Sequence, residues 1–180
     1  MEESIRVKQE FLANAPLIES AAKTVAECFK RGGKLLICGN GGSAADSQHL
    51  AAEFMGRYKN ERRALPAIAL STDSSFVTAW ANDYSYETIF ARQVEGLGKE
   101  DDVFIGLSTS GNSKNVALAA QKARQLKMKV ITLTGNKGGA LKELSDIQIN
   151  VSSSVTARIQ ESHLLAYHII CELIDREFSE

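Results

Sequence analysis

The sequence predicts an α/β protein with three layers, in which a five-stranded parallel sheet lies between two layers of helices. Two observations support this prediction. Five short apolar runs recur along the chain, and amphipathic or alanine-rich segments of helical length lie between them. Strands that alternate with helices are typical of a parallel sheet with both faces covered. We therefore expect helices on both sides of the sheet.

Each expected strand is one of the apolar runs, namely Lys34–Cys38, Pro66–Leu70, Val103–Leu107, Lys129–Leu133 and Ile147–Val151. Helices are clearest at Ser43–Arg57 and Ser113–Leu126. Apolar side chains recur at roughly helical spacing before the first strand, which predicts an N-terminal helical extension over residues 1–30. Apolar residues on nearly every turn of Val155–Phe178 predict one long C-terminal helix.

The composition suits one compact domain that spans residues 1–180, because 44% of the residues are hydrophobic and 24% are charged. Lys and Arg number 21 against 22 Asp and Glu, so the charge balance favours neither nucleic acid nor an anionic membrane. We expect a small-molecule partner.

The sequence also predicts a cytoplasmic protein. Its first ten residues are charged and lack the apolar run of a secretory signal, and no apolar span is long enough to cross a bilayer. Cys28, Cys38 and Cys171 are odd in number, far apart and surrounded by apolar residues, which indicates reduced core thiols.

Polar loops follow two of the expected strands, where ligands of open parallel sheets bind. The loop at residues 108–113 has four hydroxyl side chains and a glycine, and it precedes an expected helix whose amides favour an anion. It is typical of a phosphate site. The alternative is an ordinary helix cap, which needs only one hydroxyl.

The loop after the first strand, Gly39–Ala44, fits the dinucleotide-binding pattern G-x-G-x-x-A. The acidic residue that should bind the ribose is poorly placed, however, since Asp73 lies beyond the usual spacing of about 20 residues. We therefore interpret the glycines as allowing the backbone to approach a polar ligand.

His49 and Glu53 stand four residues apart on the expected helix that follows, so both side chains project from one face. Such a pair is often only a solvated face, but this helix begins at the ligand-binding edge and its other residues are mostly small or apolar. The C-terminal helix carries Gln160, His163 and His168 among apolar residues. A polar residue there needs partners, although a lone histidine such as His163 is more often structural than a ligand.

Several separated motifs, in the same order, give the chain a resemblance to the phosphoheptose isomerases, a family of sugar-isomerase (SIS) domain enzymes. The resemblance covers essentially the whole chain and rests on residues 38–49, the pair His49 and Glu53, Asn82-Asp83, residues 108–113, Gln160 and His168. It implies a three-layer α/β/α SIS domain, an aldose-ketose isomerase that acts on sedoheptulose 7-phosphate in bacterial heptose synthesis, and a homotetramer.

The resemblance also implies roles for individual residues. The substrate would be held by Asn40, Gly41, Gly42, Ser43, Glu53, Asn82, Asp83, Ser108, Thr109, Ser110, Ser113 and Gln160. Zinc would be bound by His49, Glu53, Gln160 and His168, and Glu53 and His168 would be the catalytic pair. Gln is an unusual zinc ligand, so its place rests on the resemblance more than on chemistry.

The residue types suit this chemistry. Ketose–aldose conversion moves a proton between adjacent carbons through an enediol, and it requires a base, an acid near oxygen and an electrophile. A non-catalytic SIS-domain protein that binds a sugar phosphate, or associates with a replication initiator, is the alternative. Such a protein has no obvious use for His49, Glu53, Gln160 and His168 together.

The spacing of Gln160 and His168 restricts how one metal could hold both. They are eight residues apart, a rise of about 12 Å in one helix. Either the helix starts after Gln160, or the two ligands of one site come from different subunits. The apolar residues around His168 favour a helix packed against a partner, so we expect active sites shared between subunits.

Overall fold

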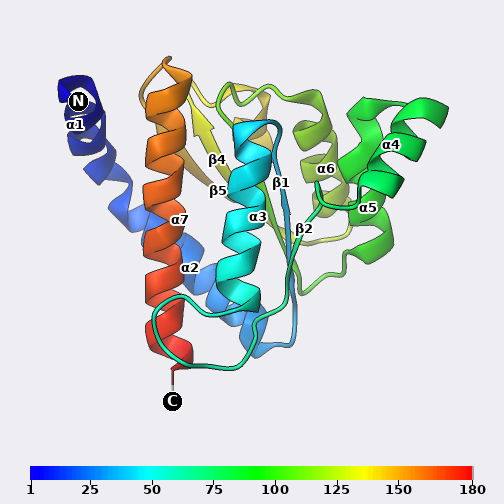
Figure 1. Ribbon diagram of the computed structural model, residues 1–180, viewed down its shortest axis with the longest axis horizontal. Helices are drawn as coiled ribbons and strands as arrows, with labels where there is room; N and C mark the ends of the chain where they lie inside the picture. Colours follow the sequence, from blue (N-terminus) through cyan, green and yellow to red (C-terminus); the bar gives the residue numbers. More distant parts are fainter. Residues whose placement is uncertain (180) are drawn as a thin grey trace.

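The computed structural model describes residues 1–179 and contains a five-stranded sheet in the order β2-β1-β3-β4-β5 (Figure 1). All neighbouring strands pair in parallel. The strands are β1 (Leu35–Cys38), β2 (Ala67–Ala69), β3 (Val103–Ser108), β4 (Lys129–Gly135) and β5 (Ile147–Val151). The predicted fold class is confirmed, and each strand lies within two residues of its expected bounds.

Strands β1 and β3 form the centre of the sheet, and every one of their residues is buried. Continuous burial explains their apolar sequences, because helices cover both faces of a parallel sheet. The chain runs from β1 outward to β2 and then returns to place β3 against the other side of β1. The loops after β1 and β3 therefore diverge at a switch point, where such sheets bind ligands.

One face of the sheet is covered by α1 (Glu2–Phe11), α2 (Ala15–Lys30), α3 (Gly42–Met55) and α7 (Thr156–Phe178). A short 3-10 turn, Leu12–Asn14, joins the first two of these helices. Helices α3 and α7 pack side by side (Figure 1). Helix α7 is continuous through Gln160 and His168, so the alternative in which the helix starts after Gln160 is wrong.

The other face is covered by α4 (Ser74–Asp83), α5 (Ile89–Leu97), α6 (Lys114–Gln125) and two short 3-10 segments, Tyr86–Thr88 and Gly139–Leu144. Phe90 and Val94 of α5 and Val116 of α6 pack on Phe104 and Val130 of the sheet. Helix α4 has no buried residue. It lies at the outer edge of this layer (Figure 1).

The three cysteines are free and buried. Within residues 1–179, no helix is both long enough and apolar enough to span a membrane. The assignment of residues 1–180 to a single SIS domain with a helical extension at residues 1–30 stays a prediction.

Candidate active site

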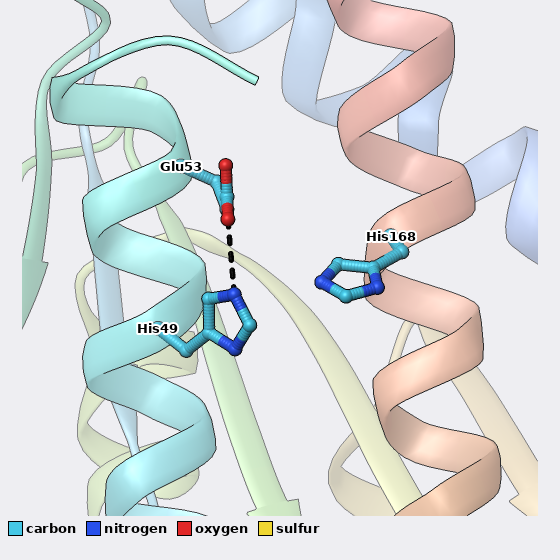
Figure 2. A group of neighbouring side chains, drawn as sticks. All are labelled: His49, Glu53 and His168. Atoms are coloured by element: carbon cyan, nitrogen blue, oxygen red, sulfur yellow. Dashed lines mark hydrogen bonds and ion pairs between the residues drawn. The ribbon is translucent and has the colours of Figure 1, made fainter. Parts of the chain in front are cut away.

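His49 and Glu53 on α3 face His168 on the neighbouring helix α7 (Figure 2). One ligand atom from each of the three side chains lies within 4.8 Å of the other two. His49 Nε2 is 2.9 Å from Glu53 Oε1, and the centroids of the two imidazole rings are 5.1 Å apart. Two nitrogens and a carboxylate oxygen form a donor set that suits a divalent transition metal such as zinc.

The local sequence explains how these side chains meet. The four-residue spacing of His49 and Glu53 places them one turn apart on α3. Helix α7 packs along α3 and supplies His168 from a position far away in the sequence. Burial lowers the pKa of His168, and His49 beside it acts in the same direction. His168 is therefore neutral near neutral pH, the form that accepts a proton or binds a metal.

The loop after β3 gathers hydroxyl groups at the start of α6. Ser108 Oγ is 2.9 Å from Ser113 Oγ and 3.5 Å from Ser110 Oγ. Although Ser113 is the N-cap residue, its hydroxyl accepts no hydrogen bond from the first turn of α6. The capping alternative therefore does not explain Ser113. The hydroxyls at the N-terminus of α6 form a site that suits a phosphate.

Gly111 gives this loop its close approach to a neighbouring loop. Its φ is +69°, and a Cβ added to it would lie 2.1 Å from the carbonyl oxygen of Gly138. Only glycine fits there. Thr109, between Ser108 and Ser110 in the sequence, is half-buried.

Hydrogen bonds of Asn40 connect the loop after β1 to α6 and to Tyr86. The side-chain amide of Asn40 donates to Asn115 Oδ1 of α6 over 2.9 Å, and Asn40 Oδ1 accepts from Asn115 and from the hydroxyl of Tyr86. Asn115 and Tyr86 were absent from the sequence predictions, because they lie 75 and 46 positions from Asn40 in the sequence. Gly41 has a φ of +56°, and Ser43 is buried in the first turn of α3.

Three predicted residues lie away from the His49 group. Gln160, on α7, lies beside the N-terminal end of α3, whereas Glu53 lies near the C-terminal end. A Cβ added to Gly42 would lie 2.3 Å from Gln160 Nε2. Asn82 and Asp83 end α4, and the Asn82 amide donates to Asp83 Oδ1 over 2.9 Å. Within the described part of this chain, Gln160 thus lines a cavity with Gly42 rather than joining the metal donors.

The structure adds two residues next to His49 that the sequence analysis did not name. The hydroxyl of Tyr167 is 3.1 Å from His49 Nδ1, and it also donates to Asp46 Oδ1 over 3.4 Å. Burial raises the pKa of both Tyr167 and Asp46. Asp46 lies one turn before His49 on α3, and this helical spacing was the available signal.

His163, by contrast, is a core residue. It is fully buried, and its Nε2 donates to the carbonyl oxygen of Thr134 over 3.0 Å. Burial lowers its pKa to about 4, so it is neutral and packed away from the His49 group. This agrees with the structural interpretation of that residue.

The chain is similar to known proteins along nearly its whole length. The sequence model of the SIS domain family matches residues 2–135. The phosphoheptose isomerase of Helicobacter pylori is 52% identical over 96% of this chain and 96% of its own. The corresponding protein of Leptospira biflexa is 52% identical over 98% of this chain and 92% of its own. The chain belongs to the phosphoheptose isomerase family.

A solved structure of the same family has the same fold. The phosphoheptose isomerase of Francisella tularensis matches with a TM-score of 0.93 and 45% identity, over 97% of this chain and 94% of that one. The family recognised from the sequence motifs, and its SIS domain, are therefore confirmed.

Proposed function

We propose that this protein is the isomerase that converts sedoheptulose 7-phosphate to D-glycero-D-manno-heptose 7-phosphate. The observation that carries the proposal is the approach of Glu53 and His168 from two different helices to within 4.8 Å. A carboxylate and a neutral imidazole on two facing helices are the groups that proton transfer through an enediol needs. The names and high identity of the relatives support the same reaction.

In the proposed mechanism, Glu53 removes the proton from the carbon next to the carbonyl and returns it to the neighbouring carbon. His168 moves the proton between the two oxygens, which its lowered pKa allows near neutral pH. The phosphate is held by Ser108, Thr109, Ser110 and Ser113 at the start of α6. The rest of the sugar contacts Asn40, Gly41, Gly42, Ser43, Glu53, Asn82, Asp83 and Gln160.

We further propose that the bound metal is zinc, one per subunit. The two imidazoles and the carboxylate of His49, His168 and Glu53 are typical zinc donors, and their mutual distances suit one ion. When bound, zinc supplies an electrophile for the oxygen that becomes negatively charged. Gln160 would be the fourth ligand.

We propose that the protein is a homotetramer with active sites shared between subunits. Gln160 is too far along α7 to join His168 of its own chain, as both lie in one continuous helix. Apolar side chains on the outside of α7 and near it remain exposed, among them Leu164, Ile169 and Leu12. An apolar cavity between α1, α2 and α7 adds to this surface. A second subunit would cover these groups and supply Gln160.

We also propose that the enzyme acts in the cytoplasm, where its product would feed heptose precursors for lipopolysaccharide core or capsule. The sugar phosphate, rather than nucleic acid or membrane, is the proposed partner.

The deciding experiment is incubation of the purified protein with sedoheptulose 7-phosphate, with aldose formation followed in the presence and absence of a chelator. We expect turnover that the chelator removes and added Zn²⁺ restores. Binding of the sugar phosphate without turnover, in zinc-loaded protein, would support the non-catalytic alternative instead.

A further inference from the structure

The hydroxyl of Tyr167 lies between the side chains of His49 and Asp46. It is 3.1 Å from His49 Nδ1 and 3.4 Å from Asp46 Oδ1. The Tyr167 residue is fully buried between α7 and α3, and Asp46 Oδ2 has no hydrogen-bond partner within residues 1–179. Core packing alone would need only the ring of Tyr167. Its hydroxyl, the only polar atom of the side chain, instead contacts a histidine of the candidate metal group.

The two nitrogens of His49 face different groups. Nε2 points to Glu53 and the metal donors, whereas Nδ1 points to Tyr167. An imidazole that binds a cation through Nε2 keeps its proton on Nδ1, and that proton needs an acceptor. Tyr167 Oη is in place as the acceptor. Because a hydroxyl can accept and donate at once, its own proton is free to reach Asp46.

We propose that Tyr167, supported by Asp46, is the positioning residue of His49. It accepts the Nδ1 proton, so that the Nε2 lone pair is directed at the metal position. Neither Tyr167 nor Asp46 touches the substrate in this arrangement. The inference rests on the proposed metal site but not on which sugar the enzyme converts.

The decisive variant is Tyr167→Phe, which keeps the buried ring and removes only the hydroxyl. We expect the affinity for Zn²⁺ to fall about 10–100-fold, the usual effect of losing such a partner. The affinity is measured on purified protein without substrate, by competition with a chromophoric chelator. The matched control is Tyr58→Phe, since the Tyr58 ring lies 5.7 Å from His168 and its hydroxyl makes no hydrogen bond within residues 1–179. That control should bind Zn²⁺ like the wild type.

A second readout separates positioning from packing. In the zinc-loaded wild type, the Nδ1 proton of His49 should give a protected NMR resonance, because it is hydrogen-bonded inside the protein. In Tyr167→Phe this resonance should be lost to exchange with water, although thermal unfolding shows the fold retained. A variant with wild-type Zn²⁺ affinity and an unchanged resonance would overturn the proposal, as would a wild-type protein that binds no Zn²⁺.

The role of Asp46 is tested by a double-mutant cycle with Tyr167. If Asp46 acts through Tyr167, Asp46→Ala should weaken Zn²⁺ binding in the wild type and have little further effect in Tyr167→Phe. Equal losses in both backgrounds would show that Asp46 acts on its own. The sugar assay keeps this inference separate from the proposed function. If the wild type turns over the sugar and Tyr167→Phe binds Zn²⁺ normally, only the positioning role is contradicted. If Tyr167→Phe weakens Zn²⁺ binding but the wild type does not convert sedoheptulose 7-phosphate, only the proposed substrate is contradicted.

Discussion

Arg62 and Asp175 form an ion pair of 3.2 Å in which each side chain is only 1% exposed. The same guanidinium donates to the backbone carbonyls of Glu53 over 2.7 Å and Phe54 over 3.0 Å. Asp175 also accepts from the backbone amide of Asn60 over 2.8 Å. The pair therefore ties the last turn of α3, which carries Glu53, to α7, which carries His168.

We expect Arg62→Met to lower the free energy of unfolding by about 3–5 kcal/mol, because it leaves the Asp175 carboxylate buried without its cation. Urea unfolding measures the loss. The control is Lys23→Ala, which breaks the exposed pair with Glu19 and should leave the urea midpoint unchanged. Equal midpoints for the two variants would mean that the buried pair does not stabilise the fold.

Glu53→Gln should lower kcat by about 10²–10⁴-fold, the usual contribution of a general base, because the amide keeps the shape and loses the basicity. Binding of the sugar phosphate, followed by its thermal shift, should be largely retained. Near-normal turnover by this variant would remove Glu53 from its proposed role.

Ser113→Ala should weaken binding of the phosphorylated sugar more than it lowers stability. Ser113 makes no capping hydrogen bond to α6, so its hydroxyl is available to the phosphate. Ser110→Ala should act in the same direction, with some cost in stability because Ser110 Oγ accepts from the amide of Asn112. Loss of a cap costs about 0.5–2 kcal/mol. A loss of that size for Ser113→Ala without ligand, and no change in ligand affinity, would restore the capping interpretation.

His163 predicts a dependence of stability on pH. Burial holds its pKa at about 4 in the folded protein against about 6.5 for a histidine in the unfolded chain, so the unfolded chain binds more protons between these values. The stabilisation is complete above pH 6.5 and is lost as the pH falls through that window. The effect is on the order of 3 kcal/mol, since one pKa unit corresponds to about 1.4 kcal/mol.

The measurement is urea unfolding of the wild type and of His163→Gln between pH 4 and pH 7. Gln keeps a donor for the Thr134 carbonyl and does not titrate. Its free energy of unfolding should fall less steeply on acidification than that of the wild type. Parallel curves would contradict the assignment.

The parts of this structure that follow from local sequence were predictable. Burial on both faces makes β1 and β3 continuously apolar, and the helical period places His49 beside Glu53. The approach of His168 to that pair is not local. It depends on the packing of α7 on α3, and only the resemblance to a known family indicated it.

Other features were settled only by the structure. Helix α4 was not predicted. None of its residues is fully buried, and Val77, Trp80 and Ala81 pack only partly buried against the core. The contact of Tyr167 with His49 joins residues 118 positions apart. The separation of Gln160 from the His49 group follows from helical rise, and the continuous α7 removes the single-chain explanation that the sequence had left open.

The shared-site arrangement predicts complementation between two inactive variants. Gln160→Ala and His168→Ala should each lose activity, because each removes one ligand of the site. If Gln160 serves the His168 site of a neighbouring subunit, a mixed oligomer contains some sites with both wild-type residues. Co-refolding the two variants, with different tags to verify hybrids, should therefore restore activity above either parent. Hybrids that form and stay inactive would contradict the shared-site arrangement.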